Sequence, residues 1–493
     1  MYYYSTRDVE KKAVTSAEAI KLGQAPDGGL FIPDHFPKTD KDFISSLADM
    51  CYAERAAAVL SLFLTDYTHE ELLGYCREAY GTDRFSPSPA PVVRVGADNV
   101  LELWHGPTCA FKDLALQLLP RLLSAALNKT GETDDALILV ATSGDTGKAA
   151  LEGYRDVGRV RIMVFYPSDG VSEMQKLQMA SQQGSNVAVA AIRGNFDDAQ
   201  SGVKRIFSDP AVAKELKSRG MFLNSANSIN IGRLVPQIVY YFSAYTDLVS
   251  CGGIRLGDKL NVTVPTGNFG NILACWIAGQ MGLPVGTLVC ATNSNKVLAD
   301  YFTSGIYDKN RKFYTTISPS MDILVSSNLE RLICFAYGPE FTADVMLRLK
   351  ESGRFSIPSD SGMLREFAGV SCNEDETRGK IAECFTKHGY CPDPHTAVAL
   401  ACAEKYRVNS GDMAPMLVVS TASPYKFPSA VASALGIGED MGSFELLEQI
   451  SAVTKTQIPS PISALKNARI RFGDLIDDSE MKNAVIAFAE RSL

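Results

Sequence analysis

Short, continuous apolar runs recur along this chain, and each is followed by a polar, glycine-bearing turn and then by a helical stretch. The first run spans residues 136–141, and the same order recurs at 160–166, 187–192, 262–264, 287–290 and 416–420. A strand that is apolar along its whole length is typical of a parallel sheet with helices on both faces. Strands that alternate with helices therefore predict an α/β fold with largely parallel sheets.

The chain divides into three parts by pattern. Its 493 residues are too many for one compact core. Residues 1–95 are mostly helical in pattern, and they end near the stretch Ser-Pro-Ser-Pro-Ala-Pro at 86–91, which cannot continue a helix. Residues 96–440 carry the alternating strands and helices, and residues 441–493 return to a helical pattern with polar breaks. We therefore expect an N-terminal domain, a two-part core and a C-terminal helical segment.

Composition excludes several classes of protein. The formal charge of −8 disfavours a nucleic-acid binder, and no apolar run reaches the roughly 20 residues that span a bilayer. The N-terminal residues lack the basic-then-apolar order of a secretory signal. The eleven cysteines form no Cys-x-x-Cys pair, which indicates neither a zinc site nor a disulfide framework, and only five histidines are present. We expect a cytoplasmic protein without a metal, with neither nucleic acid nor membrane as a partner.

One lysine is a candidate nucleophile. Lys112 follows the sequence His-Gly-Pro-Thr-Cys-Ala-Phe at 105–111 and precedes a helical run at 114–119. A lysine with apolar neighbours just after a Gly-Pro turn is poorly placed for solvent. Desolvation lowers the pKa of an amine and makes it nucleophilic near neutral pH. On this fragment alone, a surface lysine is the more common interpretation, because a lysine at the start of a helix usually faces solvent.

Three loops between a strand and a helix are candidate ligand sites, because ligands of such sheets bind at the carboxyl ends of the strands. The loop at 142–147 has two glycines and several hydroxyls that can hold an anion, or it is an ordinary capped turn. The loop at 265–271 alternates Gly and Asn before a helix, as in a phosphate cradle, although a plain turn has the same composition. It has neither a Walker lysine nor Gly-x-Gly-x-x-Gly spacing, which disfavours nucleotide binding.

The third loop, at 420–427, has hydroxyls at a strand end that can reach a buried ligand atom or simply close a turn. A nucleophilic lysine, a phosphate cradle and hydroxyls at a strand end together indicate pyridoxal 5′-phosphate (PLP). That cofactor needs an amine for its aldehyde, a phosphate site and a partner for its ring nitrogen.

Several motifs together resemble the threonine synthase family, which belongs to the tryptophan-synthase-β-like (fold type II) PLP enzymes. They are Tyr-Tyr-Ser-Thr-Arg at 3–7, Ala-Pro-Asp-Gly-Gly-Leu at 25–30, the Lys112 motif, Ser-Gly-Asp-Thr-Gly at 143–147 and Asn-Phe-Gly-Asn at 268–271. The N-terminal segment is similar to the longer-chain branch of the family rather than to cysteine synthases or threonine dehydratases. The resemblance implies two open, largely parallel α/β domains with PLP at their interface, plus a small N-terminal domain.

The resemblance also implies roles for single residues. Lys112 becomes the Schiff-base lysine, and Thr421 the partner of the pyridine nitrogen. Asp145 would lie near the cofactor ring, where relatives with an Asn use its amide, and an acid cannot donate as an amide does. The family commonly has Thr-Ala-His in the third loop, whereas this chain has Thr-Ala-Ser at 421–423. The cofactor phosphate would be bound by Gly267, Asn268, Phe269, Gly270 and Asn271.

The implied reaction converts O-phospho-L-homoserine and water to L-threonine and phosphate, the last step of threonine biosynthesis, in a monomer or a homodimer. Candidate ligands of the substrate are polar residues that can equally be loop residues. They are Ser143, Thr146, Lys148, Asn227, Ser326, Asn328 and Arg331. Two alternatives stay open, namely a phospho-lyase of the same fold that gives 2-oxobutyrate, and a PLP-binding homologue without turnover.

Overall fold

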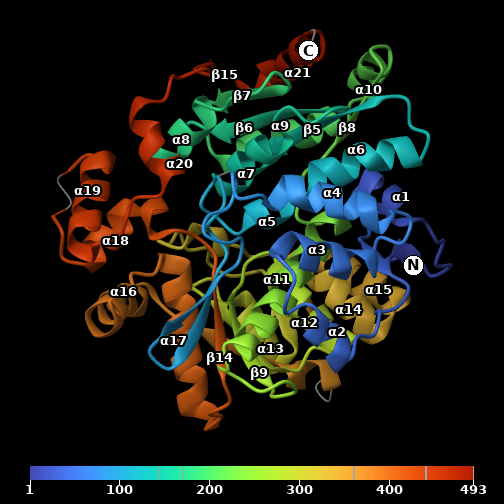
Figure 1. Ribbon diagram of the computed structural model, residues 1–493. Coiled ribbons are helices and arrows are strands. Elements are labelled where there is room, and N and C mark those ends of the chain that lie inside the picture. The colour runs from blue at the N-terminus through green and yellow to red at the C-terminus, as the bar shows by residue number, and fades with distance from the viewer. Residues whose placement is uncertain (143, 170, 359–360, 439–440, 492–493) are drawn as a thin grey trace.

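Two separate parallel sheets, each flanked by helices, organise the chain (Figure 1). The computed structural model describes residues 1–142, 144–169, 171–358, 361–438 and 441–491. Each apolar run identified above forms a strand of one of the two sheets. The prediction of an α/β fold with two open, largely parallel sheets is therefore confirmed.

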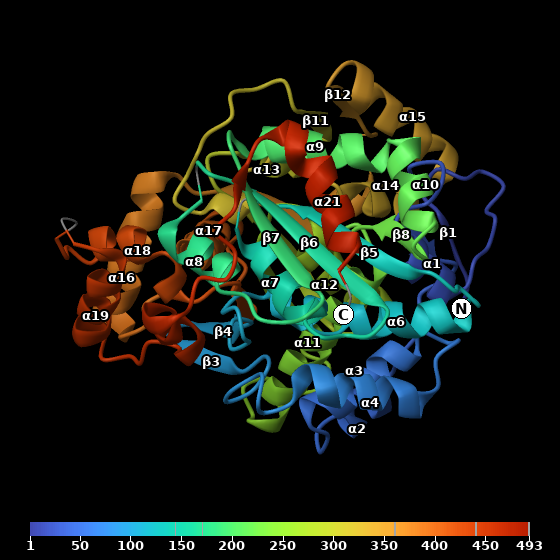
Figure 2. The ribbon, with the colours of Figure 1, turned by 90° about the horizontal axis from the view of Figure 1, so that it is seen from above.

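The five-stranded sheet is parallel throughout and lies in the upper half of Figure 1. Seen from above, α21 (Met481–Ala489) and α9 (Phe196–Phe207) lie across its strands (Figure 2). Val485 and Phe488 of α21 pack with Leu139 and Ile192 of the sheet in one apolar cluster. The C-terminal segment thus covers this sheet and adds a strand to it. The strand order is β15 (Leu475–Ile476), β7 (Val187–Ile192), β6 (Val160–Pro167), β5 (Asp135–Ala141) and β8 (Met221–Asn224).

The six-stranded sheet is parallel except for one antiparallel pair at its edge, β3 with β4. Alternate residues of its strands belong to different apolar clusters, because successive side chains of a strand point to opposite faces. Val289 and Val418 pack in the cluster that contains α17 (Pro394–Ser410), whereas Cys290 and Val419 pack in the cluster that contains α12 (Gly270–Met281). The strand order is β13 (Phe367–Ser371), β10 (Val285–Thr292), β9 (Leu260–Pro265), β14 (Met416–Ser420), β4 (Asp98–Glu102) and β3 (Val92–Val95).

The N-terminal part is a short antiparallel pair with helices, docked on the rest of the chain. Strands β1 (Tyr3–Ser5) and β2 (Phe31–Pro33) pair with each other. Arg7 pairs with Glu330 at 2.8 Å, and Arg55 pairs with Asp247 at 2.6 Å, so both ends of this part are tied to later helices. The helices of this part are α1 (Ser16–Leu22), α2 (Lys41–Ser46), α3 (Tyr52–Ser61) and α4 (His69–Tyr80).

The division into residues 1–95, 96–440 and 441–493 stays a prediction. The border near residue 95 lies between β3 and β4, which pair with each other, and the segment after 440 supplies β15 to the five-stranded sheet. Within the described ranges, no helix combines the length and the apolar character that crossing a bilayer requires. The remaining elements are α5 (Lys112–Leu116), α6 (Leu119–Lys129), α7 (Asp145–Tyr154), α8 (Glu173–Ala180), α10 (Pro210–Lys217), α11 (Ile231–Ser250), α13 (Val297–Ser304), β11 (Ile306–Asp308), α14 (Leu329–Tyr337), α15 (Pro339–Glu351), β12 (Arg354–Ser356), α16 (Glu374–His388), α18 (Pro428–Ala434), α19 (Ser443–Thr454) and α20 (Ser460–Ser463).

Candidate active site

The loop that precedes Lys112 is fixed by its own hydrogen bonds. The backbone N–H of Thr108 and its hydroxyl donate to the two carboxylate oxygens of Asp113, at 2.8 and 2.7 Å. Asp113 is fully buried, and Cys109 adopts a positive φ of 57°, a conformation that an L-residue keeps only when its surroundings enforce it. The loop therefore holds Lys112 rigidly at the first position of α5.

Lys112 and Thr421 lie side by side, because the loop before Lys112 pairs with the loop after β14. The N–H of Phe111 donates to the carbonyl of Thr421 at 2.8 Å, and the N–H of Ser423 donates to the carbonyl of Cys109 at 3.0 Å. Thr421 is buried. The structure thus brings together the candidate nucleophile and the candidate partner of a ring nitrogen.

The environment of Lys112 lowers the pKa of its amine to about 8. Burial is the largest cause, the charge of Asp145 opposes it, and the positive charges of Lys426 and Arg233 add to it. The amine lies 4.0 Å from a carboxylate oxygen of Asp145 and donates a long hydrogen bond of 3.4 Å to the hydroxyl of Ser320. An appreciable fraction of this amine is therefore unprotonated near neutral pH.

Asp145 is the first residue of α7 and directly follows Gly144. Its carboxylate accepts hydrogen bonds from Lys426 at 2.6 Å and from the Gln175 amide at 3.0 Å. Burial by itself would raise the pKa of Asp145, but the charges of Lys426 and Lys112 and these hydrogen bonds outweigh burial and hold the pKa below its usual value. Asp145 is therefore an ionised acceptor at this site.

The second loop turns sharply into α12. Phe269, the residue before the helix, has a left-handed φ of 65°, and Gly267 is so close to its neighbours that a Cβ there would lie 2.5 Å from the carbonyl oxygen of Ser320. The first N–H groups of any helix lack partners within the helix and face an anion favourably. The side-chain amide nitrogen of Asn271 has no hydrogen-bond partner in the described part of the chain, whereas its oxygen accepts from Tyr240 and Tyr241.

Three of the predicted substrate ligands support this loop instead of facing Lys112. The hydroxyl of Ser326 donates to the carbonyl of Gly267 at 2.7 Å, and both the N–H and the amide of Asn328 donate to the carbonyl of Asn268 at 3.1 and 2.9 Å. Arg331 is fully buried and donates to the side chain of Asn328 and to the carbonyls of Phe31 and Ile229.

The other predicted substrate ligands are scattered. Lys148 is buried in α7 and donates to Gln182 at 2.5 Å and to Glu152 at 3.4 Å, and burial lowers the pKa of this lysine. Thr146 is half-buried one position after Asp145, and Asn227 is exposed. Ser143 lies outside the described residues.

Two buried cations beside Lys112 were not predicted. Lys426 lies in the hydroxyl-rich loop at 420–427, and its position in this predicted ligand loop could have identified it as a site residue. Arg233 lies in the first turn of α11, after the polar run at 224–230, and is only 4% exposed. Its guanidinium donates to the carbonyl of Ala226 at 2.9 Å, while its Nε has no partner among the described residues. Burial lowers the pKa of Arg233 to about 10.

These groups fit the pyridoxal 5′-phosphate that the sequence predicts. A buried amine with a lowered pKa suits an aldehyde, and a glycine cradle at a helix start suits a phosphate. The free amide of Asn271 and the free Nε of Arg233 are donors without partners, in the described chain, at a site rich in positive charge. A glycine-bearing helix start near buried cations suits an anionic group.

Three family models match the chain, in the order N-terminus, core and C-terminus. They are "Threonine synthase N terminus" over residues 2–80, "Pyridoxal-phosphate dependent enzyme" over 100–422 and "Threonine synthase, C-terminal" over 396–486. A threonine synthase of Pseudomonas aeruginosa is 39% identical over 89% of this chain and 91% of its own length. The chain belongs to the threonine synthase family.

A solved structure of PLP-bound threonine synthase from Brucella melitensis has a TM-score of 0.87 at 36% identity, and the match covers 100% of both chains. Membership of this family makes PLP its cofactor class. A human relative named threonine synthase-like 1 is 39% identical over 88% of this chain, but the match spans only 60% of that longer protein.

Proposed function

We propose that the protein is a threonine synthase that converts O-phospho-L-homoserine and water to L-threonine and phosphate. The observation that carries the proposal is the position of Lys112, a buried amine with a pKa of about 8 beside Thr421 and Asp145. The names of the full-length relatives support the same reaction.

Within this proposal, each loop holds one part of the cofactor. Lys112 would hold the aldehyde carbon through Nζ, and Thr421 would bond to the ring nitrogen with its hydroxyl. The phosphate would be bound at residues 267–271, where the helix start and the Asn271 amide supply donors. Asp145 would lie near the ring as an acceptor, fixed by its ion pair with Lys426.

Pyridoxal 5′-phosphate, when bound, supplies an electron sink for negative charge that develops on the substrate beside its amino group. Once the substrate's amino group took the place of Nζ, Lys112 would be a free amine. With a lowered pKa, this amine can take the proton from Cα and move protons at Cβ as a general base and acid. Phosphate would leave from Cγ, Cγ would take up a proton to become the methyl group, and water would then add at Cβ while Cα regains its proton.

The substrate phosphate needs donors apart from the cofactor loop. We assign Arg233 to it, because its buried guanidinium has a free Nε and its charge reaches Lys112. Ser143, Thr146 and Lys148 stay candidates from the neighbouring loop, and Asn227 from the segment before Arg233. We assign Ser326, Asn328 and Arg331 to support of the 267–271 loop, through the hydrogen bonds described above.

A cytoplasmic location also belongs to this proposal. All eleven cysteines are free thiols, and most are buried, as expected for a protein of a reducing compartment. The partner would be the small phosphorylated amino acid, bound by a monomer or a homodimer.

The test is to incubate the purified holoprotein with O-phospho-L-homoserine and to quantify threonine, 2-oxobutyrate and phosphate together. Threonine equal to phosphate, lost in Lys112→Ala, is the expected result. Phosphate with 2-oxobutyrate would instead identify a phospho-lyase. Cofactor binding without release of phosphate would identify a homologue without turnover. This outcome is included because some relatives are named threonine synthase-like 1 rather than threonine synthase.

A further inference from the structure

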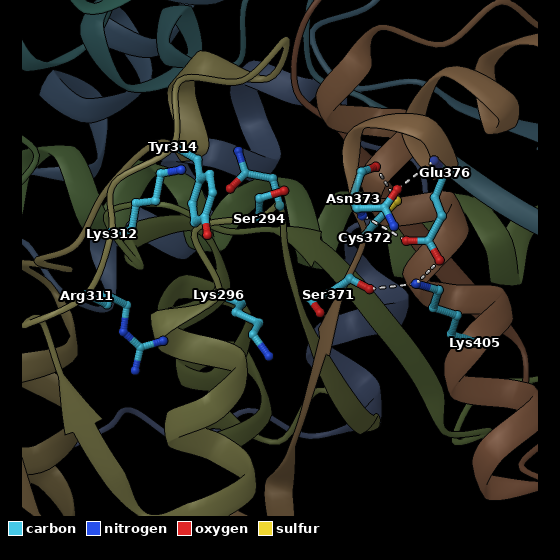
Figure 3. Close-up of a pocket in the computed structure, with 11 residues that line it drawn as sticks. Ser294, Lys296, Arg311, Lys312, Tyr314, Ser371, Cys372, Asn373, Glu376 and Lys405 are labelled. Atoms are coloured by element: carbon cyan, nitrogen blue, oxygen red, sulfur yellow. Dashed lines mark hydrogen bonds and ion pairs between the residues drawn. The ribbon is translucent and has the colours of Figure 1, made fainter.

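A second cavity, of about 590 Å³, opens at the carboxyl ends of β10 and β13 (Figure 3). It shares no lining residue with the candidate active site around Lys112. We call it the edge pocket, because β13 is the outer strand of the six-stranded sheet. Its lining residues are Asn293, Ser294, Lys296, Arg311, Lys312, Tyr314, Ser371, Cys372, Asn373, Glu376 and Lys405.

One wall of the edge pocket carries an excess of positive charge. Lys296 and Arg311 share a single carboxylate, that of Asp300, at 3.5 and 2.8 Å. Lys312 is exposed and lies 5.0 Å from the centre of the Tyr314 ring, and it has no ion pair among the described residues. Three cations and the carboxylate of Asp300 leave positive charge in excess on this wall, and the carboxylate of Asp322, which accepts from Asn293 at 2.7 Å, offsets part of it. Figure 3 shows these cations on the side of the pocket opposite Lys405.

The opposite wall is polar but balanced in charge. Lys405 pairs with Glu376 at 2.7 Å and donates to the carbonyl of Ser371 at 2.8 Å. The excess of positive charge therefore belongs to the wall of Lys296, Arg311 and Lys312. Hydroxyl and amide groups of Ser294 and Asn373 complete the lining.

We propose that the edge pocket is a second ligand site, which takes a small anion such as a phosphate monoester or a dicarboxylate. The excess of positive charge on one wall favours a negatively charged ligand. The volume admits a small metabolite, since ligand pockets start at roughly 300 Å³.

The edge pocket is linked to Lys112 through one loop. Asn293 lines the pocket, and its amide donates to Thr316 at 2.8 Å and to Asp322 at 2.7 Å. The loop held in this way begins with Lys312 and Tyr314 at the pocket and includes Ser320, whose hydroxyl accepts the hydrogen bond from Lys112. A ligand that moves this loop would alter the surroundings of Lys112, so the edge pocket is an effector site.

Binding is measured by isothermal titration calorimetry on the holoprotein, with glycerol 3-phosphate and succinate as probes. At least one probe binds the wild type, and Lys312→Glu weakens that binding about ten-fold or more, because a like charge then faces the ligand. Lys309→Glu makes the same change of charge nearby, outside the pocket lining, and is expected to leave the affinity within about two-fold. Equal affinities of Lys312→Glu and wild type, or no binding of either probe at about 10 mM, would overturn the site.

The link to Lys112 is tested by the visible absorbance of the bound cofactor during the same titration. A spectral change that saturates with the calorimetric affinity, and that Lys312→Glu removes, is expected. Binding without any spectral change, and without any change in kcat or KM, would overturn the effector role. The calorimetric result does not depend on turnover, so failure of the proposed threonine synthase activity would be seen separately.

Discussion

At the candidate active site, one carboxylate lies closer to one of its two neighbouring lysines than to the other. Asp145 lies 2.6 Å from the amine of Lys426 but 4.0 Å from that of Lys112. Lys426 is thus the closer partner of the carboxylate, and burial lowers the pKa of Lys112 to about 8 against the charge of Asp145. The unprotonated, desolvated amine is the form that attacks an aldehyde.

This arrangement of charges predicts how cofactor capture depends on pH. Capture of PLP by the apoprotein needs unprotonated Lys112, so the rate should rise with pH, with a midpoint at about 8. The charge of Asp145 raises the pKa of Lys112, so Asp145→Asn should lower the midpoint. The charge of Lys426 lowers that pKa, so Lys426→Met should raise the midpoint.

Stopped-flow absorbance on apoprotein over a range of pH measures these rates, and Lys309→Met serves as a control for loss of a distant charge. Opposite shifts for Asp145→Asn and Lys426→Met support the account. A midpoint that stays fixed in both variants would show that Lys112 does not control capture.

Sequence patterns identify functional residues that stand together in one loop better than they identify contacts between residues of different loops. Lys112, Thr421 and the 267–271 loop are recognisable because each stands in a short motif with its own chemistry. Arg233 and the Asp145–Lys426 pair are not, because their roles depend on contacts between segments far apart in the chain. A single sequence carries no record of such contacts.

At the scale of elements, the start of α12 depends on one glycine. Gly267 has no room for a side chain, since a Cβ would lie 2.5 Å from the backbone oxygen of Ser320. The backbone at residue 267 or at Ser320 would have to move to accommodate a side chain at this position. The hydrogen bonds from Ser326 and Asn328 to this loop would be strained as a result.

Gly267→Ala should therefore weaken PLP binding about ten-fold or more, because overpacking of this kind costs about 1–3 kcal/mol. Gly279→Ala, within the same helix, is the matched control, since its Cβ would make an ordinary contact of 3.4 Å with Val285. Absorbance titration of apoprotein with PLP gives both affinities. Equal affinities of the two variants would contradict a tight fit at Gly267.

Strands buried on both faces were predictable from sequence, and edge strands were not. The run at 136–141 in β5 is apolar throughout, and those at 160–166 in β6 and 262–264 in β9 are interrupted only by Arg161 and Thr263, which fits their positions inside the two sheets. Strand β3 has three partly or fully exposed residues at a sheet edge, and β15 is only two residues long. Neither provides a run of apolar residues for a pattern to detect.

At the scale of the whole molecule, Arg331 joins three parts of the chain. From α14 it donates to the carbonyl of Phe31 in β2, to that of Ile229 before α11, and to Asn328 beside the cofactor loop. The side chain is fully buried. The N-terminal part is thus tied to the core by an internal cation as well as by Arg7 and Arg55.

Arg331→Met should destabilise the apoprotein by about 2–4 kcal/mol, because it leaves buried acceptors without donors. Urea unfolding followed by circular dichroism measures the change. Arg348→Met, at an exposed ion pair on α15, should cost less than about 1 kcal/mol. Unchanged stability of Arg331→Met together with a raised KM for the substrate would instead assign Arg331 to the substrate phosphate.

A covalent bond between Lys112 and PLP can be tested directly. Borohydride reduction of the holoprotein fixes PLP on the lysine that holds it, and peptide mass spectrometry then locates the modified residue. The account predicts a single modified peptide that contains Lys112, and none in Lys112→Ala. Modification of Lys426 or Lys148, two buried lysines of the candidate site, or the absence of any modified peptide from holoprotein, would contradict it.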